Sequence, residues 1–179
     1  MELIAINRDG RPERDVPGLP ETATQILQAM RQHYAKFGFE PPWVGYLALE
    51  GRQCRGFGVF RGAPEKQHVE MAWYTFPEFR GRGVATALVR QLVRLARGQD
   101  ARLTLLVQTP AASTAASDVL EKFGFSLIGE QPDPDEGRVW EWSLDPQVQV
   151  DPVHTTLAGA LRQVNQGIAG VSQGSRQQD

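Results

Sequence analysis

The segment WYTFPEFRGRGVATALVRQLVRLA, residues 73–96, decides how the chain is interpreted, because a turn with two glycines joins a strand pattern to a helix pattern. Residues 68–76 are rich in apolar and aromatic side chains and predict a strand. Apolar residues then recur at helical spacing, and Arg90, Arg94 and Arg97 form the opposite, solvated face of a helix that Gly98 is expected to end. Such a turn leaves backbone N–H groups unpaired where the helix begins, and phosphate groups bind there.

The composition of the turn favours a diphosphate ligand. Gly81 and Gly83 lack side chains that would block the approach of a ligand, and Arg80 and Arg82 add positive charge. A dinucleotide-binding turn needs a third glycine where this chain has Thr86, and no acidic residue follows a second parallel strand in the expected place. A Walker-type loop needs a lysine after a glycine, and neither glycine has one. The turn therefore fits neither of the two common nucleotide-binding patterns.

The rest of the sequence predicts a mixed α/β domain with about seven strands and three or four helices. Residues 43–76 read as three consecutive antiparallel strands, after which strand and helix patterns alternate. We expect one domain at 1–149 and a weakly helical or disordered tail at 150–179, where the composition shifts to Gln, Gly and Ser. The strands are expected at 3–6, 43–49, 54–60, 68–76, 103–107, 125–129 and 139–144, with a hairpin loop at 131–137, and helices at 23–37, 84–96 and 116–123.

Composition argues against several classes of partner. The chain has 179 residues and a formal net charge of -2, which gives no basic field to attract nucleic acid. The single cysteine, Cys54, cannot form an internal disulfide, and the histidines are too widely spaced to build a metal site with it. The first residues lack a signal-peptide pattern, and no apolar run approaches the roughly 20 residues that cross a bilayer. We expect a soluble cytoplasmic protein that binds neither a metal nor a membrane.

With these residues in view, the turn resembles that of the GNAT acyltransferase superfamily, Arg/Gln-x-x-Gly-x-Gly/Ala, which is matched by Arg80, Gly83 and Ala85. The preceding Pro77-Glu78-Phe79 and the later Lys122-Phe123-Gly124-Phe125 are also similar to that superfamily. The resemblance covers residues 20–145. Within the superfamily, the chain looks most like the branch that includes ribosomal-protein N-terminal acetyltransferases. It implies a GNAT-like sheet and an N-acetyltransferase that moves an acetyl group from acetyl-CoA to an amine.

The resemblance also implies which residues hold acetyl-CoA. Backbone groups of Tyr74, Thr75 and Phe76 would pair with pantetheine, and Ser113 and Lys122 would lie near the cofactor. From sequence alone, Ser113 is better interpreted as the cap of the following helix. The loop that would hold the pyrophosphate consists of Arg80, Gly81, Arg82, Gly83, Val84, Ala85 and Thr86.

The catalytic groups are less fully specified. An attacking amine must lose a proton, and Glu70 is the candidate base because it shares a strand face with Ala72 and Tyr74. The alternative is a solvated or ion-paired strand carboxylate. Where many relatives carry a tyrosine that protonates the departing thiolate, this chain has Leu120. Either another group, with Tyr74 as the candidate, donates that proton, or the thiolate leaves unaided.

Two other functions compete with this one. The chain could be a non-catalytic acyl-CoA-binding module, in which Leu120 reflects lost chemistry, or a dinucleotide-binding fold. The acceptor of an acetyltransferase would be a primary amine of a small molecule, a protein N-terminus or a lysine, and the enzyme a monomer or homodimer. Acidic residues suit a cationic amine, and they lie in the segments expected to contact it: Glu40, Asp133, Asp135 and Glu136.

Overall fold

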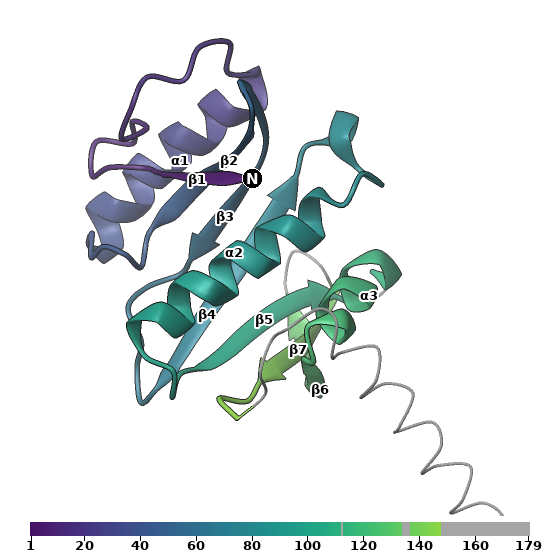
Figure 1. Ribbon diagram of the computed structural model, residues 1–179. Coiled ribbons are helices and arrows are strands. Elements are labelled where there is room, and N and C mark those ends of the chain that lie inside the picture. The colour runs from purple at the N-terminus through teal and green to yellow at the C-terminus, as the bar shows by residue number, and fades with distance from the viewer. Residues whose placement is uncertain (112, 134–136, 148–179) are drawn as a thin grey trace, which may run out of the picture.

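The computed structural model of the protein describes residues 1–111, 113–133 and 137–147. These residues form a mixed seven-stranded sheet in the order β1-β2-β3-β4-β5-β7-β6, together with three α-helices (Figure 1). The mixed α/β class and the seven strands predicted from the sequence are confirmed. The elements are β1 Glu2–Ala5, α1 Glu21–Phe37, β2 Gly45–Glu50, β3 Gln53–Phe60, β4 His68–Thr75, the 3₁₀-helix η1 Pro77–Phe79, α2 Val84–Gln99, β5 Thr104–Pro110, α3 Thr114–Lys122, β6 Ser126–Asp133 and β7 Gly137–Leu144.

The two central strands of the sheet, β4 and β5, are paired over only part of their length. Strands β1 to β4 are antiparallel, β4 and β5 are parallel, and their ladder ends at the pair Glu70–Leu106. Beyond that pair β4 stays bonded to β3 as far as Thr75, and β5 stays bonded to β7 as far as Pro110. The strands therefore diverge after Glu70, and the facing edges of their second halves do not pair with each other.

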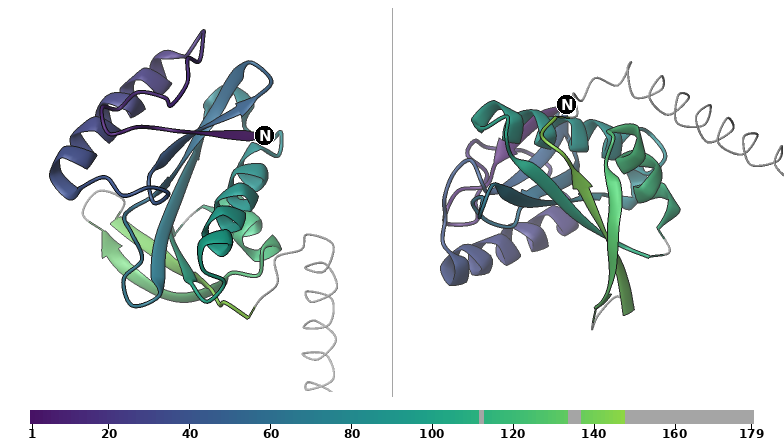
Figure 2. Two further views of the ribbon diagram at one scale, coloured as in Figure 1. Left: turned by 60° about the vertical axis from the view of Figure 1, so that its left-hand side comes forward. Right: turned by 90° about the horizontal axis from the view of Figure 1, so that it is seen from below.

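Helices α1 and α2 cover opposite faces of the sheet (Figure 2). A Cβ at Gly58 of β3 would lie 3.1 Å from Leu92 of α2, whereas one at Gly45 of β2 would lie 3.2 Å from Met30 of α1. Gly45 pairs with Val59, the neighbour of Gly58, and successive strand residues point to opposite faces. Glycine at position 58 thus lets α2 pack closely on β3 and β4, where it supports the diverging strand.

The end of α2 differs from the prediction. The helix continues through Gly98 to Gln99, and Asp100 N–H donates to the Ala96 carbonyl at 3.1 Å. Glycine lowers helix stability by only about 1 kcal/mol relative to alanine, so the packing of the apolar face carries the helix past it. The prediction that Gly98 ends the helix was therefore wrong.

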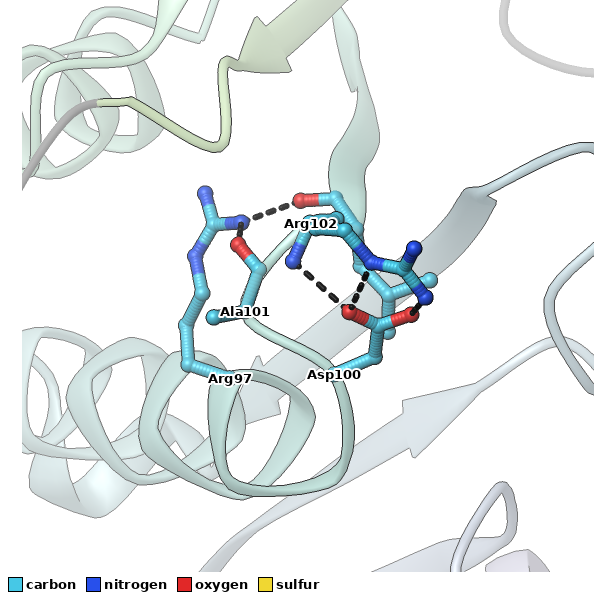
Figure 3. Close-up of polar contacts among 5 residues, drawn as sticks. Arg97, Asp100, Ala101 and Arg102 are labelled. Atoms are coloured by element: carbon cyan, nitrogen blue, oxygen red, sulfur yellow. Dashed lines mark hydrogen bonds and ion pairs between the residues drawn. The ribbon is translucent and has the colours of Figure 1, made fainter.

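The prediction that three arginines of α2 are solvated was also wrong for Arg90 and Arg97. Only Arg94 is exposed, because Arg90 lies with Cζ 6.0 Å from the centroid of the Phe123 ring and Arg97 is half-buried. Arg97 donates to the carbonyls of Ala101 and Leu103 in the turn after the helix (Figure 3) and, at 2.8 Å, to that of Asp145. It thereby ties the end of α2 to the start of β5 and to the chain after β7.

The same turn contains a local charged pair. The Asp100 carboxylate accepts hydrogen bonds from the Arg102 backbone N–H at 2.9 Å and from its guanidinium at 3.0 and 3.1 Å (Figure 3). These contacts fold the link between α2 and β5, residues 100–103, back on itself. They help to fix where β5 begins, and hence its pairing with β4.

The C-terminal strands are longer than predicted, because β6 extends to Asp133 and β7 begins at Gly137. The expected loop at 131–137 is thus largely strand, and residues 134–136 lie outside the described residues. Strand β5 likewise continues past residue 107 to Pro110. The predicted tail at 150–179 lies outside the described residues. In the described part of the chain, no helix combines the length and the apolar character needed to cross a membrane.

Candidate active site

A cleft of about 710 Å³ opens where β4 and β5 diverge. One wall is the second half of β4, the other is the end of β5, and the mouth is bounded by the turn before α2 and by α3. The lining consists of Ala72, Trp73, Tyr74, Thr75, Phe79, Arg80, Gly81, Gly83, Val84, Ala85, Thr86, Gln108, Thr109, Pro110, Ser113, Ala115, Ala116, Asp118, Val119 and Lys122.

The turn at residues 80–83 is shaped as an anion-binding site. Gly81 and Gly83 have φ angles of +71° and +76°, in the left-handed region that glycine adopts without strain. An added Cβ would meet nothing within 4 Å at either position, so backbone conformation rather than crowding favours glycine there. Gly83 caps α2, and the first N–H groups of that helix, from Val84 onward, have no partner within the helix. They face the cleft together with Arg80, which fits a phosphate group.

The β4 wall offers polar groups to an extended ligand. Tyr74 and Thr75 line the cleft, and the Thr75 hydroxyl is buried without a hydrogen-bond partner among the described residues. Such an orphaned group is uncommon in folded proteins and marks a place where a ligand can bond. Phe76 and Arg82 are not among the lining residues. The Phe76 side chain is fully buried, and its N–H donates to the Arg55 carbonyl at 3.0 Å.

Helix α3 closes the side of the cleft. Ser113 and Lys122, at its two ends, both line the cleft, with Asp118 between them. The predicted capping role of Ser113 was wrong, because its side chain makes no cap hydrogen bond; its carbonyl instead accepts the Ser117 hydroxyl at 3.0 Å. Leu120 is completely buried and points into the core. The helix position at which the family resemblance implies a tyrosine therefore supplies core packing here.

Glu70 lies at the last rung of the β4–β5 ladder, where the cleft begins, but is not among the lining residues. Its carboxylate is half-buried and forms an ion pair with Arg61, Nε to Oε1, at 3.2 Å. Burial raises the pKa of Glu70 above its ordinary value, Arg61 opposes that change, and Glu141 adds to it. The ion-paired carboxylate considered in the sequence analysis is thus present. A carboxylate with a raised pKa at this point is also suited to accept a proton.

Several lining residues escaped the sequence analysis. Gln108, Thr109 and Pro110 belong to the part of β5 that was expected to be a loop, and Asp118 lies on the helix after it. Their participation follows from the divergence of β5 from β4. The sequence held one indication of this wall. The apolar run Leu105-Leu106-Val107 is followed by the polar Gln108, which is unusual near the end of a buried strand.

The profile of the acetyltransferase (GNAT) family matches residues 11–125. The chain belongs to this family. It is accordingly an N-acetyltransferase that uses acetyl-CoA as acyl donor, with the family's arrangement of strand, glycine turn and helix. No curated protein sequence gives a match.

Solved structures of acetyltransferases share the fold at low identity. A chimera of the spermidine N-acetyltransferase SpeG from Vibrio cholerae and hSSAT is 15% identical, with a TM-score of 0.61 over 82% of this chain and 96% of that one. A Bacillus subtilis acetyltransferase in complex with CoA is 20% identical (TM-score 0.51; 56% of this chain, 75% of that one). A ribosomal-protein-alanine N-acetyltransferase from Brucella melitensis is 19% identical (TM-score 0.52; 66% and 78%). At these identities the similarity shows the fold alone.

Proposed function

We propose that the cleft binds acetyl-CoA with its pyrophosphate at the glycine turn and its thioester near Glu70. The observation that carries this proposal is the continuity of the cleft, from the unpaired N–H groups at the start of α2 to the divergence of β4 from β5. The pyrophosphate would contact Arg80, Arg82 and the backbone from Gly81 to Thr86. Pantetheine would run along the open edge of β4 at Tyr74, Thr75 and Phe76.

The remaining cofactor contacts would come from α3. Ser113 and Lys122 line the same cleft from the opposite side, so they can reach a ligand that lies along β4. The Ser113 hydroxyl has no capping role and is available to bond pantetheine. The Lys122 ammonium would add positive charge to the phosphate-binding end.

The proposed reaction is direct transfer. Glu70 accepts a proton from the acceptor amine, whose nitrogen attacks the thioester carbonyl carbon as the C–S bond breaks. The departing thiolate takes up a proton, for which Tyr74 is the candidate donor. Tyr74 shares a strand face with Glu70, and its side chain is exposed, with the Arg80 guanidinium 6.0 Å from its ring centroid. Leu120, being buried, has no part in this step.

The chemistry is tested by initial rates with acetyl-CoA and a panel of primary amines and N-terminal peptides, with free thiol as the readout. Removing a general base reduces rates by about 10²–10⁴-fold, so Glu70→Gln should lower kcat by that amount and leave CoA stabilisation in thermal melts unchanged. Glu121→Gln, at an exposed carboxylate on α3, is the control. Stabilisation by CoA with no thiol release on any acceptor would favour the non-catalytic module, and stabilisation by NAD instead of CoA would contradict the proposed ligand.

The assignment of the phosphate end has its own test. Arg80→Gln should raise the KM for acetyl-CoA but leave that for S-acetylpantetheine, which has no pyrophosphate, unchanged. An equal rise for both donors would place the pyrophosphate elsewhere.

We further propose that the acceptor is a primary amine, with a small cationic amine or a protein N-terminus ahead of a lysine side chain. The solved structures with similar folds include proteins named for spermidine and for ribosomal-protein alanine, and the ribosomal-protein branch remains our preferred one. Mass spectrometry of products formed in a cell extract would identify the acceptor. Acetylation found on lysine side chains alone would contradict this preference.

We also propose that residues 1–149 form one catalytic domain that acts in the cytoplasm as a monomer or homodimer. The support is a single sheet that includes every described strand from β1 to β7. Light scattering of the full chain would give its oligomeric state, and a chain ending at residue 149 should retain full activity.

A further inference from the structure

A second carboxylate lies on the same face of the sheet as Glu70. Glu70 pairs with Leu106 across the parallel ladder, and Gln108 pairs with Glu141 across the β5–β7 ladder. Leu106 and Gln108 are two residues apart on β5, so their side chains point to the same face. Register therefore brings Glu141 to the face of Glu70, two strands away across β5.

The Glu141 side chain is held next to the cleft by a residue that lines it. Gln108, a lining residue, donates from Nε2 to Glu141 Oε1 at 3.4 Å. The other carboxylate oxygen lies 3.5 Å from the position that a Cβ would occupy at Gly129, the partner of Glu141 on β6. An added Cβ at Gly129 would make only an ordinary contact with this oxygen, so the hydrogen bond from Gln108 is the interaction that fixes the carboxylate.

We propose that Glu141 is a positioning residue for Glu70: its carboxylate, held by Gln108 on the same face of the sheet, contributes to the local charge under which Glu70 takes the proton of the acceptor amine. This inference rests on the proposed role of Glu70 as base. Arg61 and Glu141 then have opposite effects on the ionisation of Glu70. The Arg61 guanidinium favours the ionised base, whereas the negative charge of Glu141 favours the protonated one.

The charges around Glu70 agree with this division. Burial raises the pKa of Glu70, Arg61 lowers it and Glu141 raises it. A base is most effective when its pKa lies near the working pH, and both burial and Glu141 oppose the lowering of the Glu70 pKa by Arg61. The other titratable groups that the described strands place on this face are Glu2, Cys54, His68, Tyr74 and, at the far end of β6, Asp133. Helix α1, which covers this face, adds Tyr34, whose hydroxyl accepts a hydrogen bond from Gly45 N–H.

The proposal is tested by following the Glu70 carboxyl carbon by NMR in the full chain, with the signal assigned by its loss in Glu70→Gln. The midpoint of its titration should move to lower pH in Glu141→Gln and to higher pH in Arg61→Gln, and should stay near the wild-type value in Glu141→Asp. The acid limb of the pH profile of kcat should shift in the same direction as the midpoint. At a pH on that limb, kcat relative to the plateau of each variant should rise roughly threefold in Glu141→Gln and fall by a similar factor in Arg61→Gln.

Glu130→Gln is the matched control. Glu130 pairs with Trp140, the neighbour of Glu141, so it lies on the opposite face of the hairpin, where it forms an ion pair with Arg138 at 2.6 Å. This variant changes net charge by the same amount and should leave the Glu70 midpoint in place. An unchanged midpoint in Glu141→Gln, or an equal change in Glu130→Gln, would overturn the proposal.

The two proposals can fail separately. If the midpoint moves in Glu141→Gln while Glu70→Gln retains full turnover, the coupling of the carboxylates stands and the role of Glu70 as base is wrong. If Glu70→Gln loses turnover and the midpoint does not respond to Glu141, the base stands and the positioning role is wrong.

Discussion

The indole Nε1 of Trp142 donates a hydrogen bond of 3.0 Å to the hydroxyl of Thr109. The two residues are only 3% and 4% exposed, yet Thr109 also contributes to the lining of the cleft. This bond therefore connects β7 in the core to the β5 wall of the active site. It fixes the part of β5 that has no pairing with β4.

Replacing Thr109 with valine should destabilise the protein. The change keeps the shape of the side chain but leaves the buried indole N–H without its acceptor, which costs about 1–3 kcal/mol. Urea denaturation followed by tryptophan fluorescence would measure the free energy of unfolding. Thr24→Val, at an exposed position on α1, is the control. A loss below about 0.5 kcal/mol, the range of ordinary surface changes, would show that the bond adds nothing.

Arg97→Met should also destabilise the fold. It keeps much of the apolar stem but removes the donors to the carbonyls of Ala101, Leu103 and Asp145. Hydrogen bonds to a charged group contribute about 1.5–3 kcal/mol, and about 2 kcal/mol is the expected loss. The matched control is Arg94→Met on the exposed side of the same helix. Equal free energies of unfolding for the two variants would contradict a structural role for Arg97.

The two arginines show where sequence patterns stop being informative. Helical spacing correctly placed Leu88, Leu92 and Ala96 in the core, because burial of a stripe depends on local periodicity. The same spacing predicted that Arg94 and Arg97 are equally exposed to solvent. What separates them is that Arg97 bonds carbonyls of the turn after the helix and, 48 residues further along the sequence, the carbonyl of Asp145 after β7.

Only part of the active site could be predicted from the sequence. The glycine turn follows from residues next to one another, and the sequence predicted it at 80–86. All of these residues except Arg82 line the cleft. The β5 wall was not found, because Gln108 and Thr109 reach the cleft only through the register of a parallel pair joined by a whole helix. Glu141 comes from a third strand still further along the chain. Long-range pairing of this kind leaves little trace in local periodicity.

Gly98→Ala should stabilise the protein. Gly98 lies inside α2, is exposed, and an added Cβ would meet nothing within 4 Å. Alanine is favoured over glycine within a helix by about 0.5–1 kcal/mol, so the free energy of unfolding should rise by that amount. Chemical denaturation would measure it. A less stable variant would mean that the last turn of α2 needs the glycine.

The thiol of Cys54 should be unreactive in the folded protein. Burial raises its pKa to about 11 from an ordinary value of 9.0, so at pH 8 it carries about a hundredfold less thiolate than a free thiol. Because the folded state holds this proton more tightly, the contribution of Cys54 to stability falls as pH rises from 9 towards 11. Reaction with a thiol reagent at pH 8 should be slow in buffer and fast in urea. Rapid modification in buffer would contradict the buried position.

Gly83→Ala should weaken the binding of CoA. The residue has φ +76°, and an L-residue with a Cβ in that region is disfavoured by about 1–2 kcal/mol. Relief of that strain would turn the first N–H groups of α2 away from the cleft, and affinity should fall roughly 5- to 30-fold. Calorimetric titration with CoA would measure this. Gly62→Ala, where the added Cβ meets open space and φ is not positive, is the control and should bind normally. Unchanged CoA affinity in Gly83→Ala would mean that the backbone of this turn does not hold the pyrophosphate.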